Sequence, residues 1–225
     1  MGGGGFSMEP DNSLLDDFIL GLTGRPRPRV LFLPTATGNV ATYLVNFYTA
    51  FSRRAEASHL DLFARTRDDL RRVVLDQDVL YVGGGNTANL LAIWRVHGLD
   101  AILRTAWQAG VVMAGLSAGA ICWFQAGVTD SFGPDLAALD DGLGLLPGSF
   151  CPHYDGEPAR RPTFRRLVGD GRLPDGWAAD DGVALHFVGA NLAEAVSSRP
   201  DARAYRLERS ADGATETELA TRYLG

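Results

Sequence analysis

Short apolar runs that alternate with helical segments fill the first half of the chain and constrain its fold more than any other feature. Strands are predicted at residues 30–34, 57–62, 78–82 and 111–114, and helices at residues 43–51, 68–74, 87–96 and 99–109. Strands separated by helices form a mostly parallel central sheet with helices on both faces. Residues 182–188, 191–197 and 204–209 predict a small late antiparallel portion. We therefore expect an α/β fold, with binding sites at the carboxyl ends of the parallel strands.

Composition and charge narrow the class of protein. The 225 residues, 46% hydrophobic and 21% charged, fit one domain spanning residues 1–225. A net charge of −6 disfavours general binding to nucleic acid or to anionic membranes. No segment has the length of a membrane span, and no basic and apolar leader opens the chain. Cys122 and Cys151 do not form a disulfide framework. These features predict a cytoplasmic protein without nucleic-acid or membrane partners.

The chain opens with four glycines, Gly2–Gly5, followed by Phe6. A glycine-rich opening is typical of a flexible leader. It is equally typical of a loop that follows a strand, and in that case a first strand would be missing before Gly2 and a sheet edge would be exposed. The sequence leaves both interpretations open.

The apolar run at residues 111–114 ends abruptly in Gly115-Leu116-Ser117-Ala118-Gly119-Ala120. A strand that breaks into G-x-S-x-G and then opens a helix is the local form of a nucleophile elbow. The glycines allow a strained turn and a close approach of strand and helix. This geometry would expose the Ser117 hydroxyl and point the N–H of Ala118 at a developing oxyanion. The alternative is a turn of small residues that only lets two elements pack closely.

A nucleophilic serine needs a base, and four histidines are available. His59 and His97 are interpreted as structural or surface residues. His186 lies within an alternating run that predicts a strand face. His153 follows an apolar segment and Pro152, where a loop at a strand end would carry it. We therefore favour His153 over His186 as the base.

Many aspartates are candidates for the acid that orients the base. Two of them, Asp180 and Asp181, precede a glycine at a predicted turn between strands, although most aspartates in such turns only cap the backbone. The others lie between the serine and the favoured histidine: Asp130, Asp135, Asp140 and Asp141. Spacing does not decide among these candidates.

A second glycine cluster, Gly83-Gly84-Gly85-Asn86-Thr87, follows a predicted buried strand and opens a helix. Helix starts of this kind attract negative charge, so a phosphate loop is one interpretation. No lysine follows as in a P-loop, and the G-x-G-x-x-G spacing is absent. We favour an oxyanion hole in which the N–H of Gly85 lies opposite that of Ala118.

Four of these segments together resemble the peptidase E family of serine peptidases, the aspartyl dipeptidase group that also includes the cyanophycinases. The matching pieces occur in the family's order, and the resemblance runs from the N-terminal glycines to about Val188. They are Gly83–Thr87, Gly115–Ala120, Pro152-His153-Tyr154 and Asp180-Asp181-Gly182. The resemblance implies a layout similar to that of class I glutamine amidotransferases. In those enzymes the nucleophile is a cysteine, so the serine here argues against ammonia transfer.

The resemblance also implies roles for individual residues. It makes Ser117 the nucleophile and His153 the general base. The family usually has a glutamate as third member, whereas Asp181 stands at the matching position here, with Asp180 and Asp130 as alternatives. The oxyanion hole would be formed by Gly85 and Ala118, and Arg160 matches an arginine that would bind a substrate carboxylate.

The resemblance predicts a homodimeric serine exopeptidase that hydrolyses short peptides, Asp-X dipeptides among them, through an acyl-enzyme and without a metal or cofactor. The residues after His153 differ from the pattern of strict aspartyl dipeptidases, so a different or broader substrate preference is also open. Two other classes remain as alternatives. One is an α/β-hydrolase-type esterase that uses Asp141 and His186. The other is a non-catalytic protein that binds small molecules on the same scaffold.

Overall fold

The computed structural model describes residues 1–64 and 69–225. Its first half contains a four-stranded parallel sheet in the order β2-β1-β3-β4. The strands are β1 (Arg29–Leu33), β2 (Glu56–His59), β3 (Val79–Val82) and β4 (Val112–Gly115). The helical elements are α1 (Gly5–Met8), α2 (Leu14–Gly21), η1 (Thr35–Thr37), α3 (Ala41–Phe51), α4 (Leu70–Leu75), α5 (Thr87–Val96) and α6 (Leu99–Gln108). The predicted alternation of strands and helices is confirmed, and residue 68 of one predicted helix lies outside the described residues.

Helices cover both faces of this sheet because the side chains of each central strand alternate between two cores. In β1, Val30 and Phe32 pack on one face with α3, whereas Leu31 and Leu33 pack on the other with α5 and α6. The central strands β1 and β3 are almost completely buried. The short apolar runs of the sequence are therefore strands buried on both faces.

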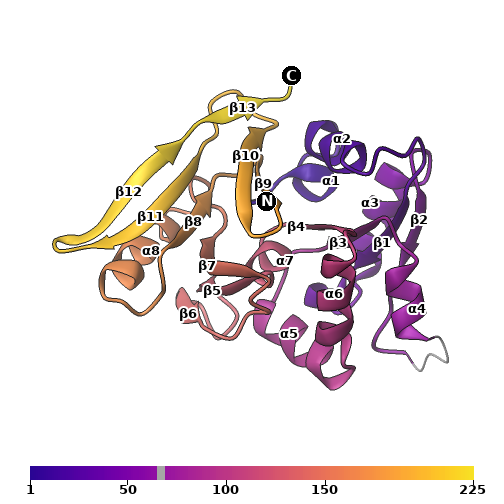
Figure 1. Ribbon diagram of the computed structural model, residues 1–225, viewed down its shortest axis with the longest axis horizontal. Coiled ribbons are helices and arrows are strands. Elements are labelled where there is room, and N and C mark those ends of the chain that lie inside the picture. Colours follow the sequence, from indigo (N-terminus) through magenta and orange to yellow (C-terminus); the bar gives the residue numbers. More distant parts are fainter. Residues whose placement is uncertain (65–68) are drawn as a thin grey trace.

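The second half of the chain is richer in strands than the sequence predicts. A short helix, α7 (Ala118–Ile121), leads into a mixed six-stranded sheet in the order β12-β11-β8-β7-β5-β6 and a three-stranded sheet in the order β13-β10-β9. In Figure 1 these sheets lie beside the parallel α/β half, with α7 between them. The elements are β5 (Phe124–Thr129), β6 (Ala137–Leu139), β7 (Leu146–Cys151), α8 (Arg160–Gly169), β8 (Gly176–Ala179), β9 (Val183–Val188), β10 (Asn191–Ser197), β11 (Ala204–Ser210), β12 (Gly213–Leu219) and β13 (Thr221–Tyr223).

The N-terminal glycines are part of the core rather than a flexible leader. Residues 2–6 are buried, and the ring of Phe6 packs against aromatic rings of the first sheet and α3, including those of Phe32 and Phe47. The N–H of Gly2 donates to the carbonyl of Val183, so the opening segment also joins the two halves. Glycine suits this position because a methyl group at Gly2 would lie 2.4 Å from the carbonyl oxygen of Ala179.

In residues 1–64 and 69–225, no helix has both the length and the apolar character required to cross a membrane. Both cysteines, Cys122 and Cys151, are buried free thiols.

Candidate active site

Ser117 lies in a strained turn between β4 and α7. Its backbone has φ 52° and ψ −116°, a left-handed conformation that is costly for a residue with a side chain. The neighbouring glycines allow the backbones of β3, β4 and α7 to approach closely at this turn. A methyl group at Gly115 would lie 2.0 Å from the carbonyl oxygen of Gly119, and one at Gly119 would lie 2.4 Å from that of Val82. The structure thus has the strand–turn–helix form that the sequence predicts.

We expect Gly119→Ala to lower the free energy of unfolding by about 1–3 kcal/mol, because its methyl group would press on the backbone of β3. Gly21→Ala is the matched control, since a methyl group there meets no atom within 4 Å and lies at a helix end. That substitution should leave the free energy of unfolding unchanged or raise it by up to about 1 kcal/mol. Urea denaturation measures both values. Equal effects of the two substitutions would contradict the close packing of the turn.

Three side chains from distant parts of the sequence form a hydrogen-bonded series. His153, in the loop after β7, places its Nε2 2.8 Å from the Oγ of Ser117. Its Nδ1 lies 2.7 Å from the Oδ1 of Asp181, in the turn between β8 and β9. The side chains of His153 and Asp181 are only 13% and 20% exposed, so surrounding protein shields this series from much of the solvent. The structure therefore brings together the serine, histidine and aspartate that the sequence singled out.

Of the three aspartates considered as the triad acid, Asp181, Asp180 and Asp130, only Asp181 contacts His153. Asp180 is buried and its carboxylate accepts a hydrogen bond from the N–H of Arg203, at 2.8 Å. Burial raises the pKa of Asp180 to about 6. Asp130 is exposed at the end of β5. Asp181 is thus the carboxylate with the geometry to orient His153.

The position of Asp181 is fixed by neighbours that the sequence did not identify. Its N–H donates to the Oδ1 of Asp155 at 2.8 Å, and its carbonyl oxygen accepts from the Nη1 of Arg199 at 3.0 Å. Arg199 also forms an ion pair with Asp155, at 3.1 Å. Methyl groups at Gly3 and Gly156 would each lie 2.2 Å from a carboxylate oxygen of Asp181, so both glycines leave room for this side chain. The sequence feature that could have pointed to Asp155 is its position two residues after His153.

Backbone N–H groups from two strand ends lie near the serine. Gly85, which follows β3, and Ala118, the first residue of α7, flank the turn as the sequence predicts. Within the described part of the chain, no hydrogen bond occupies the N–H of either residue. Gly85 has φ +131°, and a methyl group there would lie 2.5 Å from the carbonyl oxygen of Ala36. Two unoccupied backbone N–H groups beside a serine are the components of an oxyanion hole.

A hollow of about 410 Å³, called here the Ser117 hollow, opens beside these groups. Ser117 and His153 contribute to its wall, together with α1, η1 and α3. Other lining side chains combine hydroxyl, amide and apolar groups: Met8, Thr37, Val40, Thr42, Tyr43 and Asn46. Burial raises the pKa of Tyr43, whose hydroxyl accepts a hydrogen bond from the N–H of Gly84. The hydroxyl therefore stays neutral at physiological pH.

The structure does not bring Arg160 into the Ser117 hollow. Its side chain, at the start of α8, is only 3% exposed, and its Nη1 donates to the carbonyl of Val128 at 2.9 Å. Its Nε donates to Glu157 at 2.7 Å. These internal contacts occupy the guanidinium, so the predicted contact with a substrate carboxylate finds no support in this arrangement and stays a prediction.

The structure does not bring together Asp141 and His186, the acid and base of the esterase alternative. Asp141 forms an exposed ion pair with Arg95, at 2.6 Å. His186 lies on β9, where its Nδ1 is 3.6 Å from a carboxylate oxygen of Glu194 and its ring packs edge-on against Phe18. Across residues 1–64 and 69–225, no three histidine, cysteine, aspartate or glutamate side chains cluster as metal ligands would.

A serine in the turn after parallel strand β4, hydrogen-bonded to a histidine after β7 that is in turn bonded to an aspartate after β8, has the layout of a hydrolase site. The chain belongs to peptidase family S51, whose family model matches residues 1–195. The resemblance to the peptidase E family found in the sequence is thereby confirmed, and the chain stands among the peptidases.

Individual relatives agree with this assignment. An uncharacterized peptidase of Bacillus subtilis strain 168, YgaJ, is 54% identical over all of this chain and 97% of its own length. A peptidase E of Shewanella denitrificans is 34% identical over 39% of this chain and 37% of its own length. A crystal structure of a peptidase from an acI-B1 Actinobacterium covers 98% of this chain and 92% of its own, with 20% identity and a TM-score of 0.68. This structural likeness confirms the α/β fold.

Proposed function

We propose that the protein is a serine peptidase that hydrolyses short peptides through an acyl-enzyme on Ser117. The observation that carries the proposal is the hydrogen-bonded series Ser117–His153–Asp181, with 2.8 Å and 2.7 Å between its paired atoms. Membership of a peptidase family supports the same chemistry. A serine hydroxyl is a weak nucleophile at neutral pH, and a bonded imidazole makes it an effective one.

In the proposed first step, the Oγ of Ser117 attacks the carbonyl carbon of the scissile peptide bond while His153 Nε2 takes the hydroxyl proton. The carbonyl oxygen becomes an oxyanion that accepts hydrogen bonds from the N–H groups of Gly85 and Ala118. Asp181 stabilises the imidazolium that forms. Collapse of the intermediate breaks the C–N bond, and His153 gives its proton to the leaving amine. Water then attacks the ester carbonyl carbon while His153 Nε2 takes a proton from it, and the ester C–O bond breaks as His153 returns that proton to the Oγ of Ser117.

The size of the Ser117 hollow supports short substrates. Its volume of about 410 Å³ lies at the lower end of the range for small-molecule sites. The peptidase E resemblance makes Asp-X dipeptides the first substrates to test. The neutral polar groups of the hollow, such as Asn46 and Tyr43, are equally suited to uncharged side chains.

A dipeptide library digested by the protein and read by mass spectrometry tests this function. We expect a subset of dipeptides to be cleaved by the wild type and left intact by Ser117→Ala. The distribution of cleaved dipeptides gives the preferred N-terminal residue. Equal cleavage by both proteins would contradict the proposal.

Asp155 is expected to act as a positioning residue for Asp181. Asp155→Ala removes the acceptor for the Asp181 N–H, and we expect kcat to fall about tenfold with KM nearly unchanged. Asp155→Asn retains an acceptor oxygen and should keep most of the activity. Asp170→Asn, in an exposed pair at the end of α8, is the matched control and should not change kcat. Equal kcat values for Asp155→Ala and the wild type would contradict this role.

A further inference from the structure

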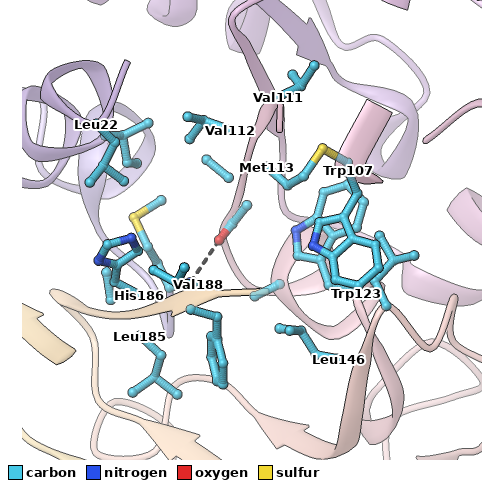
Figure 2. Close-up of a pocket in the computed structure, with 18 of the residues that line it drawn as sticks. Leu22, Trp107, Val111, Val112, Met113, Trp123, Leu146, Leu185, His186 and Val188 are labelled. Carbon is cyan, nitrogen blue, oxygen red and sulfur yellow. Dashed lines mark hydrogen bonds between the residues drawn. The ribbon is translucent and has the colours of Figure 1, made fainter. Parts of the chain in front are cut away.

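The turn that carries Ser117 borders two cavities of different character. One is the Ser117 hollow, and the other is an apolar cavity of about 530 Å³ between β4 and β9. Figure 2 shows the wall of the apolar cavity, with Trp107 and Leu185 among its side chains. Gly115 lines this cavity, whereas Ser117 lines the hollow. The side chains that can act directly on the proposed reaction are therefore those of the Ser117 hollow.

One of these side chains bonds to the loop that would supply an oxyanion donor. Among the described residues, the N–H groups of Gly83 and Asn86 donate to backbone carbonyls of β1 and η1, at 3.2 Å and 2.9 Å. The N–H of Gly84 donates to the hydroxyl oxygen of Tyr43 at 3.0 Å. The next N–H along the loop, that of Gly85, is the proposed oxyanion donor. A side chain thus holds the residue directly before this donor.

The direction of the Gly85 N–H depends on the backbone of Gly84. This N–H belongs to the peptide unit that joins the two glycines, and that unit turns with the ψ angle of Gly84. Consecutive glycines resist such rotation little, because neither has a side chain. A rotated unit would point its carbonyl oxygen, which carries partial negative charge, at the forming oxyanion. The bond to Tyr43 fixes the other peptide unit of Gly84 and so restricts this rotation.

The ring of Tyr43 is itself held firmly. It is partly buried, stacks on Phe6 with ring centres 5.5 Å apart, and packs edge-on against Phe32 at 5.1 Å. A methyl group at Gly83 would lie 2.8 Å from the Cε1 of Tyr43, so the ring and the loop are in direct contact. Burial raises the pKa of Tyr43, and a neutral phenol does not repel a developing negative charge as a phenolate would.

We propose that Tyr43 is a positioning residue for the oxyanion hole, because its bond to Gly84 holds the Gly85 N–H toward the oxygen of the tetrahedral intermediate. This inference rests on the proposed function, since an oxyanion forms only if Ser117 attacks a carbonyl carbon. A donor that is held in place before the reaction needs no reorganisation when the charge develops.

Tyr43→Phe tests the proposal, because it keeps the ring and removes the hydroxyl. Loss of a whole oxyanion donor lowers kcat by about 10²–10³-fold, and here the donor is misdirected rather than removed. We therefore expect kcat to fall about 10–100-fold on a cleaved dipeptide, with KM within about twofold of the wild type. Tyr48→Phe is the matched control on the same helix. Its hydroxyl bonds to the Nδ1 of His59 at 2.8 Å, away from the loop, so kcat should not change.

Two ligands distinguish positioning of the oxyanion donor from a general structural effect. A dipeptide analogue whose scissile carbonyl is reduced to a methylene group cannot form an oxyanion. Its inhibition constant should therefore be the same for Tyr43→Phe and the wild type. A fluorophosphonate that reacts with Ser117 does place an oxygen in the oxyanion hole. Its rate of labelling should fall in proportion to kcat in Tyr43→Phe and stay unchanged in Tyr48→Phe.

The possible results separate this inference from the proposed function. Equal kcat and equal labelling rates for Tyr43→Phe and the wild type would overturn the role of Tyr43 and leave the peptidase chemistry intact. Unchanged kcat with a raised KM and weaker binding of the reduced analogue would assign the hydroxyl to substrate binding, and would also overturn it. A wild-type protein that is not labelled on Ser117 and cleaves no dipeptide would contradict the proposed function, and the inference would fail with it.

Discussion

Ser117→Ala is expected to lower kcat/KM for peptide hydrolysis by about 10⁴-fold or more. The substitution removes the only atom that forms the acyl-enzyme in the proposed mechanism, while the oxyanion N–H groups of Gly85 and Ala118 stay in place. A small residual rate over the uncatalysed reaction should therefore persist. The left-handed backbone at Ser117 is strained for alanine as well, so the free energy of unfolding should change little.

Ser58→Ala is the matched control, because Ser58 lies on the edge strand β2 and its hydroxyl donates a long hydrogen bond to the carbonyl of Val30, at 3.4 Å. It should retain wild-type kcat/KM. Steady-state kinetics on a cleaved dipeptide and urea denaturation measure the two properties. Wild-type turnover by Ser117→Ala would rule out this serine as the nucleophile.

Two histidine substitutions should have very different effects. His153→Ala removes the base that lies 2.8 Å from the serine oxygen, and we expect kcat to fall about 10⁴-fold. His186→Ala changes a ring on β9 that packs against Phe18, and kcat should stay within about twofold of the wild type. Kinetics on the same dipeptide measure both.

This comparison also separates the peptidase from the esterase alternative. An esterase that used Asp141 and His186 would lose activity with His186→Ala and keep it with His153→Ala. Such a result would require Asp141 to leave its ion pair with Arg95. The thermal stability of both variants should be measured, so that a loss of kcat is not confused with unfolding.

The parallel half of the fold was predictable because its central strands are buried on both faces. Residues 30–33 and 79–82 are continuous apolar runs, and long amphipathic segments separate them. The second half was harder to predict because several of its strands, such as β12, are only partly buried and are largely polar. Their structure comes from pairing between distant segments, which local patterns do not encode.

The site was predictable where local geometry dictates the residue type. Ser117 lies in a G-x-S-x-G turn. Both glycines of this turn are required because a methyl group at either position would collide with neighbouring backbone atoms. Asp181 was singled out by the family resemblance rather than by spacing. Asp155 and Arg199 were missed because they act on Asp181 across 26 and 18 positions of sequence.

The surroundings of Arg160 could not be predicted from the sequence. The family resemblance implied a contact with a substrate carboxylate, whereas the guanidinium is bonded inside the protein to Val128 and Glu157. The sequence alone does not show whether an arginine at the start of a helix bonds to groups inside the protein or to a substrate. The buried position follows from tertiary contacts alone.

Covalent labelling with a fluorophosphonate probe tests the central claim most directly, because the probe reacts only with a serine that a neighbouring base activates. Intact-mass and peptide mass spectrometry should show one adduct, on Ser117, in the wild type. Labelling should be absent in Ser117→Ala and strongly slowed in His153→Ala. A folded wild-type protein that forms no adduct, or forms it on another residue, would contradict the account.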